Sequence, residues 1–292
     1  MFKEYCREKA GLIEDELVKL LVIESPLSSE LCESMSYSLM AGGKRLRPIL
    51  LMAAADAVGG SGNKYLQSAC GMEMIHTYSL IHDDLPAMDN DDYRRGKLTN
   101  HKVYGEAMAI LAGDALLTQA FEVISKQQGV SAEKVLRVIQ EMSTAAGQSG
   151  MVGGQVIDLL SENKRIDQAT LEKMHQGKTG ALFKAAIRSG AILADASEEQ
   201  LAALTIYAEK FGLAFQITDD ILDVVGTTAK IGKPVGSDIR NNKSTYVSLS
   251  SLAIAKELAV QTVQEALAAL EIFDQKADIL REVVKYLISR DN

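Results

Sequence analysis

The sequence predicts an all-α fold, a single large helical bundle around a central cavity. Apolar residues recur at three- and four-residue spacing through several long stretches, which is the periodicity of a buried helix face. Alternation of apolar and polar residues, which indicates strands, is hard to find. The 292 residues hold no proline between Pro86 and Pro234 and no linker rich in Ser, Gly or Pro. We therefore expect one domain over residues 1–292.

The helices can be assigned in chain order from this periodicity. The stretches that predict them are residues 12–22, 66–81, 107–124, 201–225 and 252–270. Because Gly and Pro end helices and form turns, we expect breaks at residues 42–43, 59–60, 86–96, 129, 163–167 and 226–236. Four glycines between residues 147 and 154 interrupt a helical region and predict a kink or a close approach of two helices.

Composition and charge argue against several classes of protein. The formal net charge is -8, whereas nucleic-acid binding relies on a broad basic face. Residues 2–22 carry charges throughout, unlike a signal peptide, and no charge-free apolar run is long enough to span a membrane. The cysteines Cys6, Cys32 and Cys70 are widely spaced, which argues against disulfides or a zinc site and favours a cytoplasmic protein.

Two aspartate-rich clusters, far apart in the chain, predict a metal site. They consist of Asp83, Asp84 and Asp89 after one apolar helical stretch and Asp219, Asp220 and Asp223 at the end of another. Like charges that converge on one cavity repel each other unless a divalent cation balances them. Lys and Arg residues follow both clusters, so we expect metal ions to bridge the carboxylates to polyphosphate oxygens and basic side chains to balance the remaining charge.

Helix geometry predicts how the carboxylates are placed. Asp219 and Asp223 are four residues apart and share a helix face, with Asp220 to one side. Pro86 disfavours helical geometry in the residue before it, so the first Asp pair is expected at a helix C-terminus, with Asp89 returning from a loop. Carboxylates at a helix C-terminus are disfavoured by the macrodipole, a cost that bound cations would offset.

Several polar residues also have a purely structural interpretation. Lys44 and Arg47 follow a diglycine, and solvated turn residues are the commoner outcome for such a pattern. Asp114 lies inside an apolar stretch and is either a buried, hydrogen-bonded carboxylate or a group that orients basic residues; we favour the structural role. His82 and His175 lack partners at metal-ligand spacing, so we expect them to be solvent-facing or hydrogen-bonded within the fold.

Taken together, these residues resemble the trans-isoprenyl diphosphate synthases, and most closely the bacterial-type farnesyl diphosphate synthases. The matching blocks are residues 42–48, 76–84, 89 with 94–96, 113–117, 154–155, 177–180, 215–223 and 232–238, which together extend over nearly the whole chain. The resemblance implies the isoprenoid synthase fold, a homodimer, and a prenyltransferase that condenses isopentenyl diphosphate with allylic diphosphates.

The resemblance also implies a role for each candidate site residue. Three Mg²⁺ ions would be bound by Asp83, Asp89 and Asp219, with Asp84, Asp220 and Asp223 assisting directly or through water. The allylic diphosphate would be held by Arg94, Lys178 and Lys233, and isopentenyl diphosphate by Lys44, Arg47, His76 and Arg95. Oxygens facing the developing allylic cation would come from Lys178, Thr179 and Gln216.

Product length depends on the residue at the floor of the cavity. Tyr78 lies five residues before Asp83, which is about 7.5 Å along the helix axis and away from the metals. Its ring would oppose a further isoprene unit, whereas the small Ser79 leaves room above it. The expected product is farnesyl diphosphate (C15), unless Tyr78 is an ordinary core tyrosine.

Two other enzyme activities and a catalytically inactive partner subunit are the competing hypotheses. A geranylgeranyl diphosphate (C20) synthase shares every motif and would differ only at the cavity floor. A terpene cyclase would use one aspartate cluster and a less strict second metal motif, so the second cluster and the Lys44/Arg47 pair argue against it. An inactive partner subunit would be expected to have lost some of the aspartates.

Overall fold

The computed structural model confirms the all-α fold and describes residues 2–22, 27–225 and 244–289. The α-helices are α1 (Phe2–Leu21), α2 (Ser29–Leu39), α3 (Leu46–Ala57), α4 (Leu66–Asp83), α5 (Asn100–Tyr104), α6 (Glu106–Ser125), α7 (Ala132–Ala146), α8 (Met151–Ser161), α9 (Gln168–His175), α10 (Ala181–Leu193), α11 (Glu198–Val225), α14 (Tyr246–Leu249), α15 (Leu252–Ala269) and α16 (Asp278–Ser289). Shorter elements are the 3₁₀ turns η1 (Gly62–Tyr65) and η3 (Gln275–Ala277), the π-helical turn η2 (Gln176–Gly180), and the strands β1 (Tyr93–Arg94) and β2 (Lys97–Leu98).

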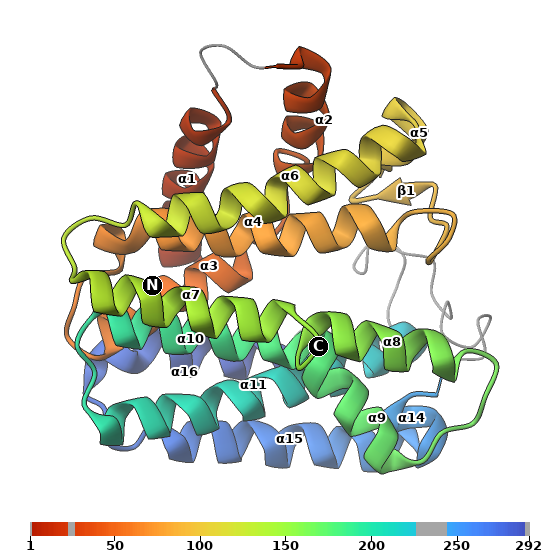
Figure 1. Ribbon diagram of the computed structural model, residues 1–292. Coiled ribbons are helices and arrows are strands. Elements are labelled where there is room, and N and C mark those ends of the chain that lie inside the picture. Colours follow the sequence, from red (N-terminus) through yellow and green to blue (C-terminus); the bar gives the residue numbers. More distant parts are fainter. Residues whose placement is uncertain (1, 23–26, 226–243, 290–292) are drawn as a thin grey trace.

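The long helices pack in layers (Figure 1). In the upper layer α4 and α6 run side by side, with α1 and α2 standing on them. Below, α3 packs on α10, which also contacts α7 and α11, and α11 packs on α15. The C-terminal ends of α4 and α11 carry the two aspartate clusters, so this layered arrangement decides how the clusters face each other.

Apolar side chains from most of the helices form one main core and a smaller second one. The main cluster extends from Ile13 in α1 to Leu287 in α16. The second cluster joins α9, α11, α14 and α15 through residues such as Leu171, Ile217 and Tyr246. Burying one such side chain contributes about 1.5 to 3 kcal/mol. The second cluster therefore fixes the end of α11, where Asp219 lies.

The glycine-rich break predicted between residues 147 and 154 is present. Helix α7 ends at Ala146 and α8 begins at Met151. A Cβ atom at Gly154 would overlap the backbone nitrogen of Lys178, so only glycine lets α8 approach η2 this closely. The break thus brings α8 against the segment that carries Lys178 and Thr179.

A two-stranded hairpin that the sequence analysis did not predict follows α4. Tyr93 pairs with Leu98 and Arg94 with Lys97, in antiparallel register. The two turn residues, Arg95 and Gly96, both have positive φ, as a type I′ turn requires. Strands of two residues are too short to give an alternating pattern.

The prediction for Asp114 was wrong. Its side chain is 61% exposed, because the outer face of α6 is not covered within the described chain. Ile110 and Leu111 are exposed on the same helix. By length and composition alone, α6 is the one helix among the described residues that could cross a membrane, and it packs along α4.

Candidate active site

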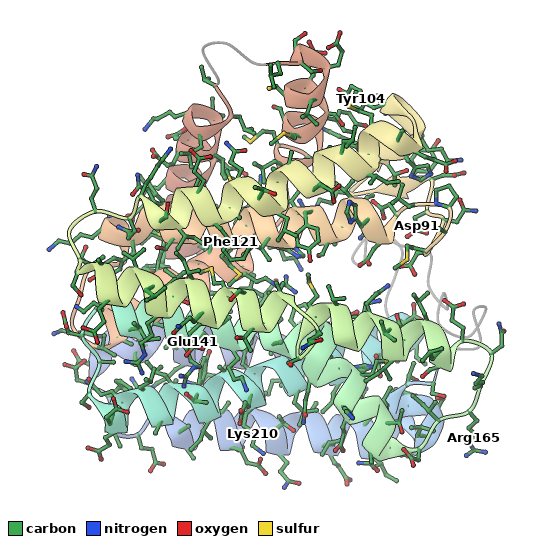
Figure 2. The ribbon with its side chains drawn as sticks, viewed as in Figure 1. Asp91, Tyr104, Phe121, Glu141, Arg165 and Lys210 are labelled. Atoms are coloured by element: carbon green, nitrogen blue, oxygen red, sulfur yellow. The ribbon has the colours of Figure 1, made fainter. Side chains whose placement is uncertain are left out.

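The first aspartate cluster lies where α4 ends, as predicted. Asp83 is the last residue of the helix and Asp84 is its C-cap. The chain then turns back, and the Asp89 amide donates to the Asp83 carbonyl at 2.8 Å. Asp91 marks this loop in Figure 2, beside β1. The three aspartates of the cluster are therefore held within one tight turn.

Arg94 forms a bidentate ion pair with Asp84. Its Nε lies 2.7 Å from Oδ1 and 2.9 Å from Oδ2, and its Nη2 lies 2.6 Å from Oδ1. Asp84 is only 3% exposed. Its charge is therefore directed to Arg94, whereas Asp83 and Asp89 are more accessible.

The first cluster resists ionisation in the absence of a cation. Burial raises the pKa of Asp83 to about 6; the charge of Lys178 opposes this shift, and that of Asp89 adds to it. Burial also raises the pKa of Asp84, against the opposing effect of Arg94. A divalent ion would reverse this balance by stabilising the ionised carboxylates.

The second cluster lies in the last turns of α11. Asp219 is exposed, whereas Asp220 and Asp223 are buried. An Asp220 carboxylate oxygen accepts the Tyr246 amide at 2.8 Å, which ties α11 to the start of α14. This bond directs Asp220 toward α14. The shared face of Asp219 and Asp223 stays a prediction, because Asp219 is exposed whereas Asp223 is buried.

A cavity of about 210 Å³ brings several predicted residues together. Lys178, Thr179 and Gln216 line it beside Asp219, from η2 and α11. The π-helical turn η2 widens the backbone at this point, a feature that often occurs at functional sites. Since Lys178 also lowers the pKa of Asp83, it links the two aspartate clusters electrostatically.

Asp158 of α8 belongs to this cavity and was missed in the sequence analysis. Its Oδ2 lies 2.6 Å from the Lys178 Nζ, and the residue is 8% exposed. The available signal was a lone carboxylate within the apolar stretch from Val156 to Leu160. A buried charge in such a stretch requires a partner, and here that partner is Lys178.

The predicted isopentenyl diphosphate residues form a second, basic group. Arg47 lies 3.3 Å from the His76 Nε2, and its guanidinium carbon lies 4.5 Å from the centre of the Phe183 ring. Burial and the charge of Arg47 hold the pKa of His76 well below its ordinary value. His76 is therefore neutral and accepts the hydrogen bond from Arg47.

The loop before α3 joins this basic group. Arg95 Nη1 donates to the carbonyl of Gly42. A Cβ atom at Gly43 would overlap the Arg95 guanidinium, and Gly43 has a φ of 122°. The exposed Lys44 follows directly. Arg45, by contrast, is 2% exposed and binds Glu73 at 2.7 Å, so its role is structural.

Lys233, which was predicted to hold the allylic diphosphate, lies outside the described residues. Across residues 2–22, 27–225 and 244–289, no three His, Cys, Asp or Glu side chains are placed to bind one ion by themselves. Within this part of the chain, an ion would therefore need further oxygens, from water or substrate, to complete its coordination, as Mg²⁺ commonly does.

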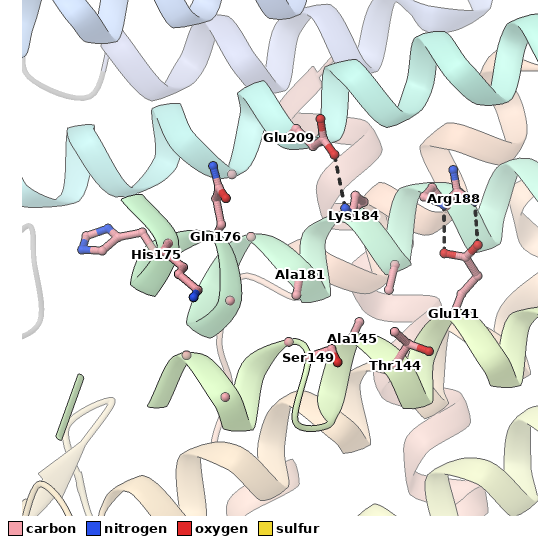
Figure 3. A pocket seen from close by; sticks show the side chains of 18 of the residues that line it. Glu141, Thr144, Ala145, Ser149, His175, Gln176, Ala181, Lys184, Arg188 and Glu209 are labelled. Carbon is pink, nitrogen blue, oxygen red and sulfur yellow. Dashed lines mark hydrogen bonds and ion pairs between the residues drawn. The ribbon is translucent and has the colours of Figure 1, made fainter. Parts of the chain in front are cut away.

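A larger groove, of about 1070 Å³, is lined by residues of α7, α8, α9, η2, α10 and α11 (Figure 3). The three aspartates of the first cluster are not among its lining residues. Arg188 binds Glu141 there at 2.7 Å, and Lys184 binds Glu209 at 3.2 Å. These basic side chains are already paired with carboxylates. The groove is therefore a weaker candidate for the active site than the smaller cavity, in spite of its size.

Comparison with known proteins identifies the family. The polyprenyl synthetase family model matches residues 28–287. Two similar relatives are a farnesyl diphosphate synthase of Micrococcus luteus, 50% identical over 98% of this chain and 97% of the relative, and a geranylgeranyl diphosphate synthase of Cyanophora paradoxa, 47% identical over 99% and 96%. The chain belongs to the polyprenyl synthetase family. A solved FPP/GFPP synthase from Zymomonas mobilis superimposes on this polyprenyl synthetase with a TM-score of 0.88 at 37% identity, covering 98% of both chains.

Membership of the polyprenyl synthetases makes this chain a prenyltransferase of isoprenoid biosynthesis. The relatives carry the names of both farnesyl and geranylgeranyl diphosphate synthases. Family membership therefore leaves product length to be argued from the residues of this particular polyprenyl synthetase.

Proposed function

We propose that the protein is a Mg²⁺-dependent (2E,6E)-farnesyl diphosphate synthase formed by a single domain over residues 1–292. It would condense isopentenyl diphosphate head to tail with dimethylallyl diphosphate and then with geranyl diphosphate. The observation that carries this proposal is the position of Lys178, which lines the cavity beside Asp219 and also lowers the pKa of Asp83. One basic group between two carboxylate clusters suits a diphosphate held by metal ions.

The carboxylates fit Mg²⁺ in chemistry and charge. Asp83, Asp89 and Asp219 offer hard oxygen ligands, and the raised pKa of Asp83 indicates a site that favours a cation. In the proposed arrangement these residues hold three ions, with Asp84 and Asp223 assisting. The bound ions would supply charge stabilisation for the diphosphate as the carbon-oxygen bond breaks.

The side chains around the cavity would share the remaining work. Lys178 would hold the allylic diphosphate with Arg94 and Lys233, so that basic groups already face the anion when it forms. Oxygens of Lys178, Thr179 and Gln216 would face the allylic cation. Because water would capture that cation, the site must exclude it during the reaction.

The basic group at the other end of the site would place the second substrate. Arg47, His76, Arg95 and Lys44 would hold isopentenyl diphosphate so that its double bond can attack C1 of the allylic cation. A proton then leaves the new intermediate for an oxygen of the released diphosphate. The neutral His76 and the positive Arg47 together present a donor-rich surface to that substrate.

The proposed C15 product rests on the ring of Tyr78, whose place in the main core also fits an ordinary core tyrosine. Its side chain belongs to the main core cluster and is 6% exposed. Ser79 is partly exposed, and its hydroxyl donates to the His76 carbonyl at 2.8 Å. A fixed ring below a small residue would stop chain growth by overlap. The C20 synthase remains the alternative, because one relative at 47% identity carries that name.

We also propose a cytoplasmic homodimer that does not bind nucleic acid. The outer face of α6, with Ile110 and Leu111 exposed, and the exposed Val103 of the preceding α5 form an apolar surface that a second copy would cover. Cys6, Cys32 and Cys70 are all free, as in a reducing compartment. Light scattering on the purified protein tests the dimer.

The function is tested by measuring product length. Purified protein is incubated with isopentenyl and dimethylallyl diphosphates, and the dephosphorylated products are separated by chain length. The expected main product is the C15 alcohol. A main C20 product would point to the alternative synthase, and a cyclic hydrocarbon would point to a terpene cyclase.

A further inference from the structure

His82 connects α4 to α6 at the level of the candidate active site. Its Nε2 lies 3.0 Å from the backbone carbonyl oxygen of Ile110, so this nitrogen carries the hydrogen and donates. The same nitrogen is 3.9 Å from the Asp114 carboxylate, beyond hydrogen-bond distance. The backbone carbonyl of α6 is therefore the group that orients the imidazole.

Gly113 provides the space for this contact. A Cβ atom at Gly113 would overlap the imidazole of His82, including Nε2. Any other residue there would push the ring away from α6. The close approach of α4 and α6 at this point therefore depends on one glycine and one histidine.

The other side of the His82 ring faces Tyr78. The two residues are one helical turn apart on α4, and their ring centres lie 5.7 Å apart at an interplanar angle of 83°. This is the edge-to-face arrangement that aromatic pairs prefer. Because Tyr78 is 6% exposed, the contact leaves its ring little room to turn.

We propose that His82 is a positioning residue for product length, which holds the Tyr78 ring in place through its own bond to α6. This inference rests on the proposed function, in which Tyr78 closes the floor of the cavity. A ring can limit chain growth only while it stays in one orientation, because a ring that rotates aside releases the volume of another isoprene unit. The α4–α6 contact would thus help to set where elongation stops.

The test measures product length in wild type and in His82→Ala, His82→Phe, Tyr78→Ala and the double variant that combines Tyr78→Ala with His82→Ala. We expect the ratio of C20 to C15 product to rise about fivefold in His82→Ala, the effect of losing one edge-to-face contact. His82→Phe keeps an aromatic edge but loses the donor, so its shift should be smaller. Thr118→Ala, one turn beyond Asp114 on the exposed face of α6, is the control and should still stop at C15.

The double variant separates positioning from general destabilisation. If His82 acts through Tyr78, Tyr78→Ala with His82→Ala should give the same product distribution as Tyr78→Ala alone. Gly113→Ala offers a second route, since it displaces the imidazole without removing it, and should also lengthen products. Thermal unfolding of each variant shows whether it is folded at the assay temperature.

Two failures can be told apart. If wild type stops at C15 and Tyr78→Ala lengthens the product, but His82→Ala and Gly113→Ala still stop at C15, the inference is overturned while the proposed function stands. If wild type makes mainly C20, the proposed function fails, and the inference fails with it.

Discussion

At the scale of single residues, the site consists of charges that are paired in advance. Asp84 is bound by Arg94 and Asp158 by Lys178, both at 2.6 Å. Each pair holds a basic side chain at the edge of the candidate site without leaving a buried charge unbalanced. We therefore expect the two members of a pair to depend on each other when either is replaced.

The proposed metal ligands should be far more sensitive to replacement than other aspartates. We predict that Asp83→Ala or Asp219→Ala lowers kcat about a hundredfold, equivalent to losing about 3 kcal/mol of transition-state stabilisation. Asp195→Ala serves as the control, because the Asp195 side chain is 79% exposed and forms a surface ion pair with Lys134. Steady-state kinetics that place all three variants at the same rate would contradict this assignment.

The depressed pKa of His76 predicts how stability depends on pH. Below about pH 6.5 the unfolded histidine takes up a proton while the folded one does not, so stability falls as pH falls. When the pH falls from about one unit above this value to about one unit below it, the free energy of unfolding should decrease in wild type. The decrease should be about 1 kcal/mol smaller in His76→Gln. Urea unfolding at both pH values measures the difference, and parallel losses in the two proteins would argue against a neutral His76 in the folded protein.

At the scale of elements, glycines decide how closely the helices approach the site. Gly154 brings α8 against η2, and Gly113 brings α6 against His82. Both are glycines in helices, where the residue normally costs stability. The cost is offset here by close packing that places chemistry-bearing side chains.

Replacing a helical glycine by alanine should lower stability where the glycine is in close contact with another element and raise it where the glycine faces open space. We predict that Gly154→Ala destabilises the protein by about 1 to 3 kcal/mol, because the new methyl group overlaps the Lys178 backbone. Gly11→Ala in α1 meets nothing within 4 Å and should stabilise by about 0.5 to 1 kcal/mol. Denaturant unfolding compares the two. Equal effects at both sites would show that the α8–η2 contact is less strict than described.

The sequence was sufficient for the longest helices, but not for the hairpin after α4 or for the pairings between helices. The helical periodicity of residues 66–81 predicted α4 to within two residues at its end, and Pro86 predicted where it stops. The Asp158–Lys178 pair and the exposure of Asp114 could not be predicted, because both depend on which helices lie next to each other. Periodicity reports that a helix has an apolar face but not what covers it.

At the scale of the whole molecule, the C-terminal ends of α4 and α11 contribute charged side chains to one candidate site. Carboxylates of both clusters surround Lys178, and burial already raises the pKa of Asp83 to about 6. Burial thus disfavours the ionised form of Asp83, although Lys178 lies close enough to oppose the shift. Divalent cations and the arriving diphosphate would complete the charge balance together.

Removal of metal should accordingly abolish turnover. We predict that exhaustive treatment with EDTA reduces the rate to background and that added Mg²⁺ restores it, because the carboxylates alone would repel the diphosphate. The helical content, followed by circular dichroism, should be unchanged, which would separate a catalytic requirement from unfolding. Full turnover after EDTA treatment would disprove the proposed mechanism.

The hairpin after α4 has a consequence for changes in chain length. Its two-residue turn at Arg95 and Gly96 fixes the register in which Tyr93 faces Leu98. Arg94 thereby reaches Asp84 while the adjacent Arg95 reaches Gly42. An insertion or deletion of one residue in this turn would misplace both guanidinium groups at once. We therefore expect the hairpin to accept a substitution at the exposed Tyr93 far more readily than any change in its number of residues.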